Sequence, residues 1–183
     1  MFSLNVPLPP AVGRLAGDLH PKLSGFDRLR DRHTLVCKRF GVDDVGAGEP
    51  DRPRPPKSEA VETLRRDLRG LLSGTVPFET AVTGVDAFES PASGAGPVVY
   101  LVVESDELVR LHRRLCAAYD AIEGIEGDEY VPHVTLARGG DSEAVTDALD
   151  RVRSVDVEPI RWRVHALDLY DPEFREVAAT IGL

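Results

Sequence analysis

The residues best suited to chemistry lie at positions 132–138, where the sequence reads PHVTLAR. Its β-branched and apolar residues favour a strand, and Gly139 and Gly140 would end it. Side chains alternate along a strand, so His133 and Thr135 should point to the same side. An imidazole can transfer protons near neutral pH, and a hydroxyl beside it can donate to a phosphoryl oxygen. The pair therefore indicates phosphoester chemistry.

A second histidine and threonine, His33 and Thr34, occur one hundred residues earlier in the stretch RHTLVCK. Two such strands facing one another would form a two-histidine phosphoesterase site. A single His-x-Ser/Thr-apolar match arises by chance in roughly one chain in five of this composition, so the evidence lies in the pair. Taken alone, either histidine could equally be a hydrogen-bonded strand residue near the surface.

Length and composition predict one domain over residues 1–183. A chain of 183 residues that is 42% hydrophobic can bury one good core, which could be arranged in two lobes. The first residues lack the features of a signal peptide, and no apolar stretch is long enough to cross a membrane. Two cysteines are too few for a disulfide framework, and none has zinc spacing, so a reduced cytoplasm fits best.

The charge is uneven along the chain. The net charge of −9 argues against a general nucleic-acid coat. However, residues 1–70 contain 13 Lys and Arg against 10 Asp and Glu, whereas the remainder contains 9 against 21. Basic residues surround the first histidine: Arg28, Arg30, Arg32, Lys38, Arg39, Arg52, Arg54 and Lys57. They predict a local anion site, and the alternative is a solvated surface of mixed charge.

Apolar spacing predicts an α+β fold rather than a doubly wound sheet. Helices are expected over residues 10–23 and after the N-cap candidates Ser58, Ser105 and Ser142. Residues 41–57, rich in Gly and Pro, are expected to form a flexible loop. Each half contains strand, helix and strand, which indicates a faint duplication. Strands are expected over residues 2–8, 30–40, 78–88, 98–104, 160–170 and 174–181.

The sequence resembles the 2H phosphoesterase superfamily, and within it the 2′-5′ RNA ligase-like branch. The resemblance extends over nearly the whole chain and rests on residues 2–9, 82–88, 130–138 and 160–183. It implies a bilobal fold with pseudo-twofold symmetry, in which two antiparallel sheets flank a central cleft and helices cover the outer faces. The two histidine-bearing strands would line this cleft.

The first motif departs from the family pattern of His, apolar, Thr or Ser, apolar. Thr34 follows His33 directly, and Leu35 stands where the hydroxyl should be. In a regular strand Thr34 would face away from His33. A bulge could restore it, or the half-site has lost its hydroxyl. In the third alternative, Arg32 takes the place of the missing histidine and pairs with Thr34.

The resemblance implies a metal-independent phosphodiesterase, with no cofactor, that hydrolyses 2′,3′-cyclic phosphates of RNA ends or nucleotides. Some members join RNA ends through a 2′-5′ bond in the reverse direction. Of His33 and His133, one would accept a proton from water and the other would protonate the departing ribose oxygen. Thr135, with Thr34 or a nearby Arg or Lys, would stabilise the phosphoryl charge.

Further residues are candidates for substrate binding. Arg138 and Lys38 each lie five residues after a histidine, where alternation points them away but the strand end could still reach a phosphate. Arg32 is a third candidate, and Tyr130 could stack on a base or pack in the core. The expected partners are RNA ends or small cyclic nucleotides, with no membrane, and the chain is expected to be a monomer.

Two alternatives stay open. The protein could be a non-catalytic binder of RNA ends or nucleotides whose first motif has degenerated. It could also be a phosphodiesterase for another cyclic ester.

Overall fold

The computed structural model describes residues 1–41, 56–141 and 143–183. Most of the expected loop 41–57, and the predicted cap Ser142, therefore lie outside the described residues. The helices are α1 (Pro10–Leu19), α2 (Lys57–Leu72), α3 (Asp106–Ala118) and α4 (Glu143–Arg153), with 3-10 turns η1 (His20–Leu23) and η2 (Gly127–Glu129). The strands are β1 (Phe2–Val6), β2 (Arg28–Leu29), β3 (Leu35–Phe40), β4 (Phe78–Phe88), β5 (Val98–Glu104), β6 (His133–Arg138), β7 (Ile160–Val164), β8 (Ala166–Asp171) and β9 (Glu176–Gly182).

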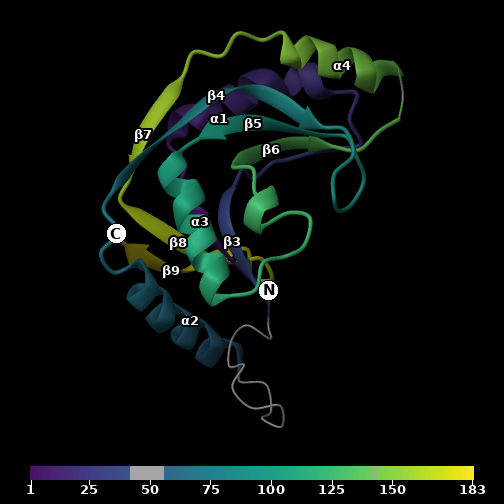
Figure 1. The fold of residues 1–183 in the computed structure, drawn as a ribbon. Coiled ribbons are helices and arrows are strands. Elements are labelled where there is room, and N and C mark those ends of the chain that lie inside the picture. Colours follow the sequence, from purple (N-terminus) through teal and green to yellow (C-terminus); the bar gives the residue numbers. More distant parts are fainter. Residues whose placement is uncertain (42–55, 142) are drawn as a thin grey trace.

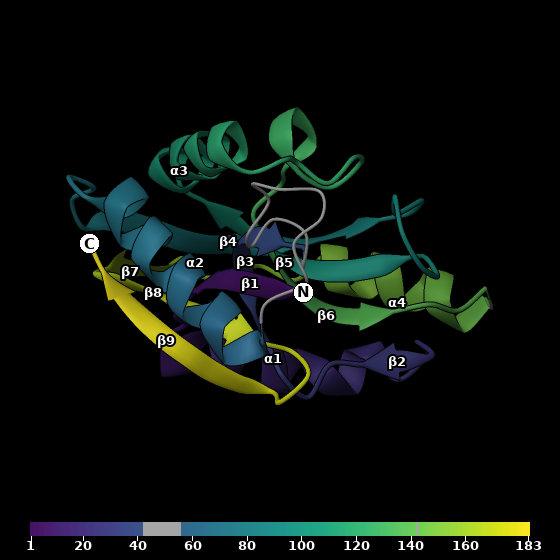
Figure 2. The same ribbon diagram turned by 90° about the horizontal axis from the view of Figure 1, so that it is seen from below.

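The strands form two antiparallel halves that meet at one point, which confirms the bilobal α+β prediction. The strand order is β7-β4-β5-β6-β3-β1-β8-β9, and β2 pairs with β6. Between β6 and β3 the ladder holds one pair, Leu35 with Val134. The sheet curls around this junction, and the helices cover its outer faces (Figures 1 and 2). Helix α4 packs on β4, α3 on β3, and α2 on β9.

Helix α3 shows how sequence spacing becomes packing. Leu108, Leu111 and Leu115 lie on one side of the helix, and all three are buried. Burial of each such side chain contributes about 1.5–3 kcal/mol. The hydroxyl of Ser105 caps the helix by accepting a hydrogen bond from the backbone N–H of Leu108, as predicted. The expected cap at Ser58 is wrong, because α2 begins at Lys57.

Four predicted strands have different limits, and the first of them, expected over residues 2–8, ends at Val6. Strand β3 begins at Leu35, so residues 30–34 precede it, and the prediction that His33 and Thr34 lie within a strand is wrong. The expected strand 160–170 is divided into β7 and β8 at His165. The last strand, β9, begins at Glu176 rather than Phe174 because residues 172–175 make the β8–β9 turn.

Candidate functional site

A cavity of about 540 Å³ opens where the two halves of the sheet meet. This volume is typical of small-molecule sites. Residues of both histidine motifs line the cavity, together with the loop after β4 and the segment before β6. The lining residues are Arg30, Arg32, Thr34, Val36, Arg39, Phe88, Ser90, Pro91, Ala92, Ser93, Val98, Gly124, Ile125, Glu129, Tyr130, Val131, His133, Thr135 and Arg138.

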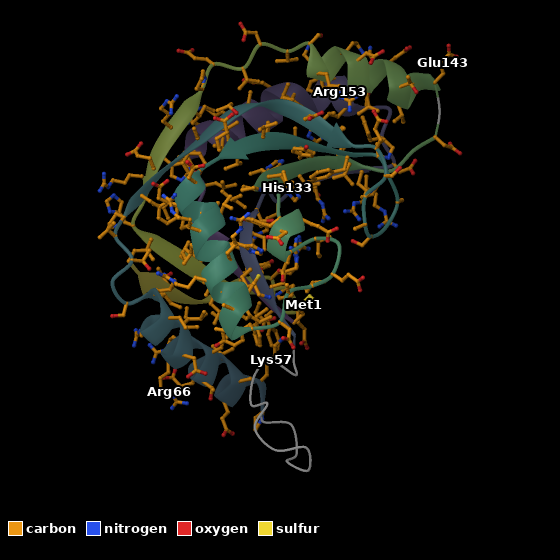
Figure 3. All side chains as sticks on the ribbon, viewed as in Figure 1. Met1, Lys57, Arg66, His133, Glu143 and Arg153 are labelled. Atoms are coloured by element: carbon orange, nitrogen blue, oxygen red, sulfur yellow. The ribbon has the colours of Figure 1, made fainter. Side chains whose placement is uncertain are left out.

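The second motif lies in the cavity as strand alternation predicts. His133 and Thr135, two residues apart on β6, both line it, whereas Val134 and Leu136 are buried on the other side. In Figure 3, His133 lies near the centre of the molecule at the beginning of β6.

The surroundings of His133 fix its protonation. Its Nδ1 lies 2.7 Å from the carbonyl oxygen of Val131, and since a carbonyl only accepts, Nδ1 carries the proton and donates it. Burial is the main cause that lowers the pKa of His133, and the positive charges of Arg39 and Arg138 lower it further; the bond to Val131 opposes them. The neutral imidazole therefore leaves Nε2 with a lone pair that can accept a proton.

Two aromatic rings hold the imidazole of His133 in place. The ring centroids of Phe88 and Tyr100 each lie 5.3 Å from that of His133, both in edge-on geometry. These rings stack on each other, with centroids 4.2 Å apart. Packed rings and the bond to Val131 restrict the side chain of His133 to one orientation, as a proton-transfer group needs.

In the first motif, Arg32 and Thr34 line the cavity, and His33 is not among the lining residues. This arrangement corresponds to the third alternative, with Arg32 in place of the missing histidine. The half-buried His33 has its pKa lowered mainly by burial and next by the nearby His20, against the opposing effect of Asp31. The structure therefore does not place His33 opposite His133 across the cleft, as was predicted. The even-numbered residues from 30 to 36 line the cavity, and His33 lies between two of them.

Contacts from the β8–β9 hairpin position Arg32. Its Nη1 donates a hydrogen bond of 2.9 Å to the carbonyl oxygen of Arg175. The guanidinium carbon lies 4.2 Å from the ring centroid of Tyr170, a cation–π contact. Arg175 has a φ of 56°, which turns the backbone at this point. The C-terminal hairpin therefore helps to hold a positive charge at the cavity.

A bulge in β6 brings Arg138 to the cavity. Tyr100 pairs with Thr135 and Val99 pairs with Ala137, so Leu136 is an extra residue on β6. An extra residue reverses the alternation beyond it. Arg138 therefore lies on the side of His133, although strict alternation points it away.

A second bulge, in β3, has the opposite consequence for Lys38. Leu4 pairs with Lys38 and Asn5 with Val36, which leaves Cys37 as the extra residue. Lys38 is completely buried, and its ammonium donates to Glu126 (2.7 Å) and to two backbone carbonyls. The prediction that Lys38 binds phosphate is wrong, since its donors are occupied. Arg39, the next residue, lines the cavity instead.

Tyr130 lines the cavity and also packs against the protein interior. One face of its ring stacks on His112 at a centroid distance of 3.8 Å. Its hydroxyl donates to the carbonyl oxygen of Val36 over 2.8 Å. Burial raises the pKa of this hydroxyl well above its usual range. The contacts join the segment before β6 to β3 and form one cavity wall.

Sequence reasoning gave Arg30 and Arg39 only as members of the basic group around the first motif, and it missed Phe88. Arg30 alternates with Arg32 and Thr34, so its place in the cavity could have been inferred. Arg39 depends on the β3 bulge, and Phe88 depends on how β4 continues into the loop at 90–97, for which the sequence has no signal. In the described parts of the chain, no three His, Cys, Asp or Glu side chains gather as a metal site requires.

Comparisons with known proteins agree with this fold. The family model described as the 2′-5′ RNA ligase superfamily matches residues 49–173, which contain the second motif but not the first. A crystal structure of TT0787 from Thermus thermophilus aligns with 19% identity and a TM-score of 0.60, covering 100% of this chain and 97% of that one. E. coli LigT complexed with NADP+ aligns with 14% identity and a TM-score of 0.56, covering 100% and 96%.

No curated protein is similar enough in sequence to count as a match. Among the described helices, none combines the length and apolar character that a membrane span requires.

Proposed function

The chain belongs to the 2′-5′ RNA ligase superfamily, and on that premise we propose that it binds the phosphate of an RNA end or nucleotide and hydrolyses 2′,3′-cyclic phosphates with His133 as its single proton-transfer residue. One observation carries the proposal: His133 and Thr135 line the same cavity as Thr34 and four arginines. These arginines are Arg30, Arg32, Arg39 and Arg138. Imidazole, hydroxyls and guanidinium groups together form a site for a phosphoester.

Each group has a proposed role. The Nε2 atom of His133 takes a proton from the attacking water, because Nδ1 is already protonated and bonded to Val131. Thr135 and Thr34 donate to phosphoryl oxygens, and Arg32 stabilises the charge that grows on them. An arginine does not release its proton at neutral pH, so Arg32 does not act as a general acid.

The balance of the reaction follows from these roles. Water loses a proton to His133 and forms a bond to phosphorus, while the bond from phosphorus to one ribose oxygen breaks. The departing oxygen takes its proton from solvent, because the cavity offers no second imidazole among its lining residues. The product is a ribose phosphomonoester, and we expect its rate of formation to be below that of a site with two imidazoles.

The second candidate function is phosphate binding without turnover. Arg32 stands two residues before Thr34, where the family's first motif has a histidine. This favours binding without turnover, because an arginine adds affinity for phosphate but removes the general acid. Both candidates use the same cavity and the same anion.

The experiment that separates them is incubation with the four nucleoside 2′,3′-cyclic phosphates in excess chelator, with identification of products by phosphorus NMR. Hydrolysis that His133→Ala abolishes and His33→Ala preserves supports the enzyme. Saturable binding of a nucleoside 2′-phosphate, without hydrolysis, supports the binding protein. Absence of hydrolysis together with absence of binding of the nucleoside 2′-phosphate contradicts both.

A further inference from the structure

Both contacts that hold Arg32 at the cavity come from one hairpin. Strands β8 and β9 are joined by a turn at residues 172–175. Tyr170, whose ring lies under the guanidinium, stands just before this turn, and Arg175, whose carbonyl oxygen accepts from Nη1, is its last residue. The position of Arg32 therefore depends on how the turn is folded.

Asp171 holds the turn from its inner side. It is the last residue of β8 and is 3% exposed. Its Oδ1 accepts a hydrogen bond of 2.9 Å from the backbone N–H of Glu173, a contact by which aspartate fixes turns. Burial alone would raise the pKa of Asp171, but hydrogen bonds from Lys57 and from the backbone of Glu173 and Phe174 outweigh it and lower the pKa. The carboxylate is therefore charged at neutral pH.

Lys57, the first residue of α2, supplies the opposite charge (Figure 3). Its Nζ lies 2.8 Å from each carboxylate oxygen of Asp171. The same ammonium contacts Glu173 and lies 4.5 Å from the ring centroid of Phe174. An ion pair with the exposed Glu173 contributes little, whereas the buried carboxylate of Asp171 needs its cation. The pair of Lys57 and Asp171 therefore joins the start of α2 to the turn.

The backbone of Arg175 needs such support. Its φ of 56° lies in the left-handed region, which residues with a side chain seldom adopt. Conformations of this kind persist where neighbouring contacts fix them. The turn in this conformation offers the carbonyl oxygen of Arg175 to Arg32 over 2.9 Å. A turn that relaxed would withdraw that acceptor.

The charge of Arg32 is available to a ligand. Arg32 forms no ion pair with a carboxylate in residues 1–41, 56–141 or 143–183. Its contacts with a carbonyl oxygen and an aromatic ring hold the guanidinium without neutralising it. A guanidinium held in one position binds a phosphate at a smaller cost in side-chain entropy than a mobile one.

We propose that Asp171 and Lys57 are positioning residues for phosphate binding. Their ion pair holds the β8–β9 turn in the conformation that presents the carbonyl oxygen of Arg175 and the ring of Tyr170 to Arg32. Neither Asp171 nor Lys57 is among the residues that line the cavity, so both act through Arg32. The inference rests on the proposed function in either of its two forms, because both use Arg32 to bind the phosphate.

The test measures the affinity for a nucleoside 2′-phosphate by calorimetry. Asp171→Asn removes a negative charge, so electrostatics alone would make an anion bind more tightly. Loss of the position of Arg32 acts in the opposite direction, and we expect binding to become about tenfold weaker. The sign of the change therefore separates positioning from an effect of charge.

A double-mutant cycle shows whether the effect passes through Arg32. Arg32→Gln should weaken binding by itself. Adding Asp171→Asn to Arg32→Gln should cause no further loss, because the guanidinium that the turn positions is already gone. Two independent effects would instead multiply.

Variants of Lys57 complete the test and take the place of Asp171→Asn in the cycle if that variant does not fold. Lys57→Met should weaken binding by a similar factor, and Lys57→Arg, which keeps the charge, should restore most of the affinity. Arg65→Met is the matched control and should leave the affinity nearly unchanged. Arg65 also lies on α2, its side chain has the same 32% exposure as that of Lys57, and it too pairs with a carboxylate.

The outcomes separate this inference from the proposed function. If the unaltered protein binds the nucleoside 2′-phosphate but Lys57→Met and Asp171→Asn bind it equally well or more tightly, the positioning role is wrong and the proposed function stands. Effects that multiply in the cycle, or a Lys57→Arg no better than Lys57→Met, also overturn the positioning role. If the unaltered protein does not bind the nucleoside 2′-phosphate, both proposals are overturned.

Discussion

The two sides of the cavity have the same fold and different chemistry. On the β6 side, His133 and Thr135 lie two residues apart on a strand, with the imidazole fixed by a carbonyl and two rings. On the β3 side, Arg32 and Thr34 have the same spacing but precede the strand. The residues that form each half of the site are therefore those whose side chains alternate toward the cavity, whether or not one of them is a histidine.

The difference changes what the site can do. In a site with two imidazoles, one can act as the general base and the other as the general acid. A site with one imidazole and one guanidinium has the general base, and its guanidinium stabilises negative charge.

The two histidines should differ most. His133→Ala removes the only imidazole of the described cavity, so the rate of cyclic phosphate hydrolysis should fall by on the order of 10²–10⁴-fold. His33→Ala should keep most of the rate, because His33 does not line the cavity. Single-turnover rates of the two folded variants make the comparison, and an equal loss in both would restore His33 to the site.

Lys38 and Arg39, which flank the β3 bulge, should differ in kind. Lys38→Met removes the buried ammonium 2.7 Å from Glu126 and leaves that carboxylate only the more distant Arg39, at 3.8 Å, so it should destabilise the fold by about 3–5 kcal/mol. Arg39→Gln should weaken phosphate binding with a smaller loss of stability, since Arg39 lines the cavity and its ion pair with Glu126 is the longer of the two. Urea unfolding and ligand titration measure the two effects. Weaker binding by a fully stable Lys38→Met would contradict this assignment.

Replacing Arg32 by histidine should make the two sides alike. Arg32→His supplies a second imidazole beside Thr34, and the hydrolysis rate should rise by on the order of 10²-fold, the lower end of what a positioned general acid contributes. The control is Arg32→Gln, which removes the charge without adding an acid and should slow the reaction. A rate no higher in Arg32→His than in Arg32→Gln would argue against the proposed equivalence.

The two threonines should behave alike even though the histidines do not. Thr34→Ala and Thr135→Ala each remove one donor to the phosphoryl group, and each should slow the reaction by roughly 10²-fold. Both variants should leave the Tm nearly unchanged, because both side chains are only partly buried. A silent Thr34→Ala would mean that only the β6 side contacts the phosphate.

The dependence of rate on pH should show one ionisation. Burial holds the pKa of His133 below its ordinary value of about 6.5, so the base is neutral at pH 7 and becomes protonated below that pKa. The rate should rise with pH through this single step and then stay level. A bell-shaped profile in the unaltered protein would indicate a second proton-transfer group, whereas Arg32→His should produce one.

The sequence predicted the elements that depend on local pattern. Strands β4 and β5 have the predicted limits, because alternating apolar residues and the Gly- and Pro-rich segment between them act locally. The second motif lies on its strand for the same reason. The equivalence of Arg32 with His133 was one of three interpretations of the first motif, and the structure was needed to select it.

The errors share a physical cause. Whether Arg138 or Lys38 faces the cavity depends on bulges at Leu136 and Cys37, and a bulge is set by how a strand pairs with its neighbours. The extra residue is invisible in the strand's own sequence. Lys38 was misassigned because its partner, Glu126, is distant in the chain and its burial follows from the fold.

The most direct test of the central claim, that the cavity holds a single imidazole, is the NMR spectrum of the histidine side chains during titration with a nucleoside 2′-phosphate. We expect the ring resonances of His133 to shift with saturation and those of His33 to stay in place, and the shift should persist in His33→Ala. Shifts of equal size in His33, or none in His133, would contradict the account.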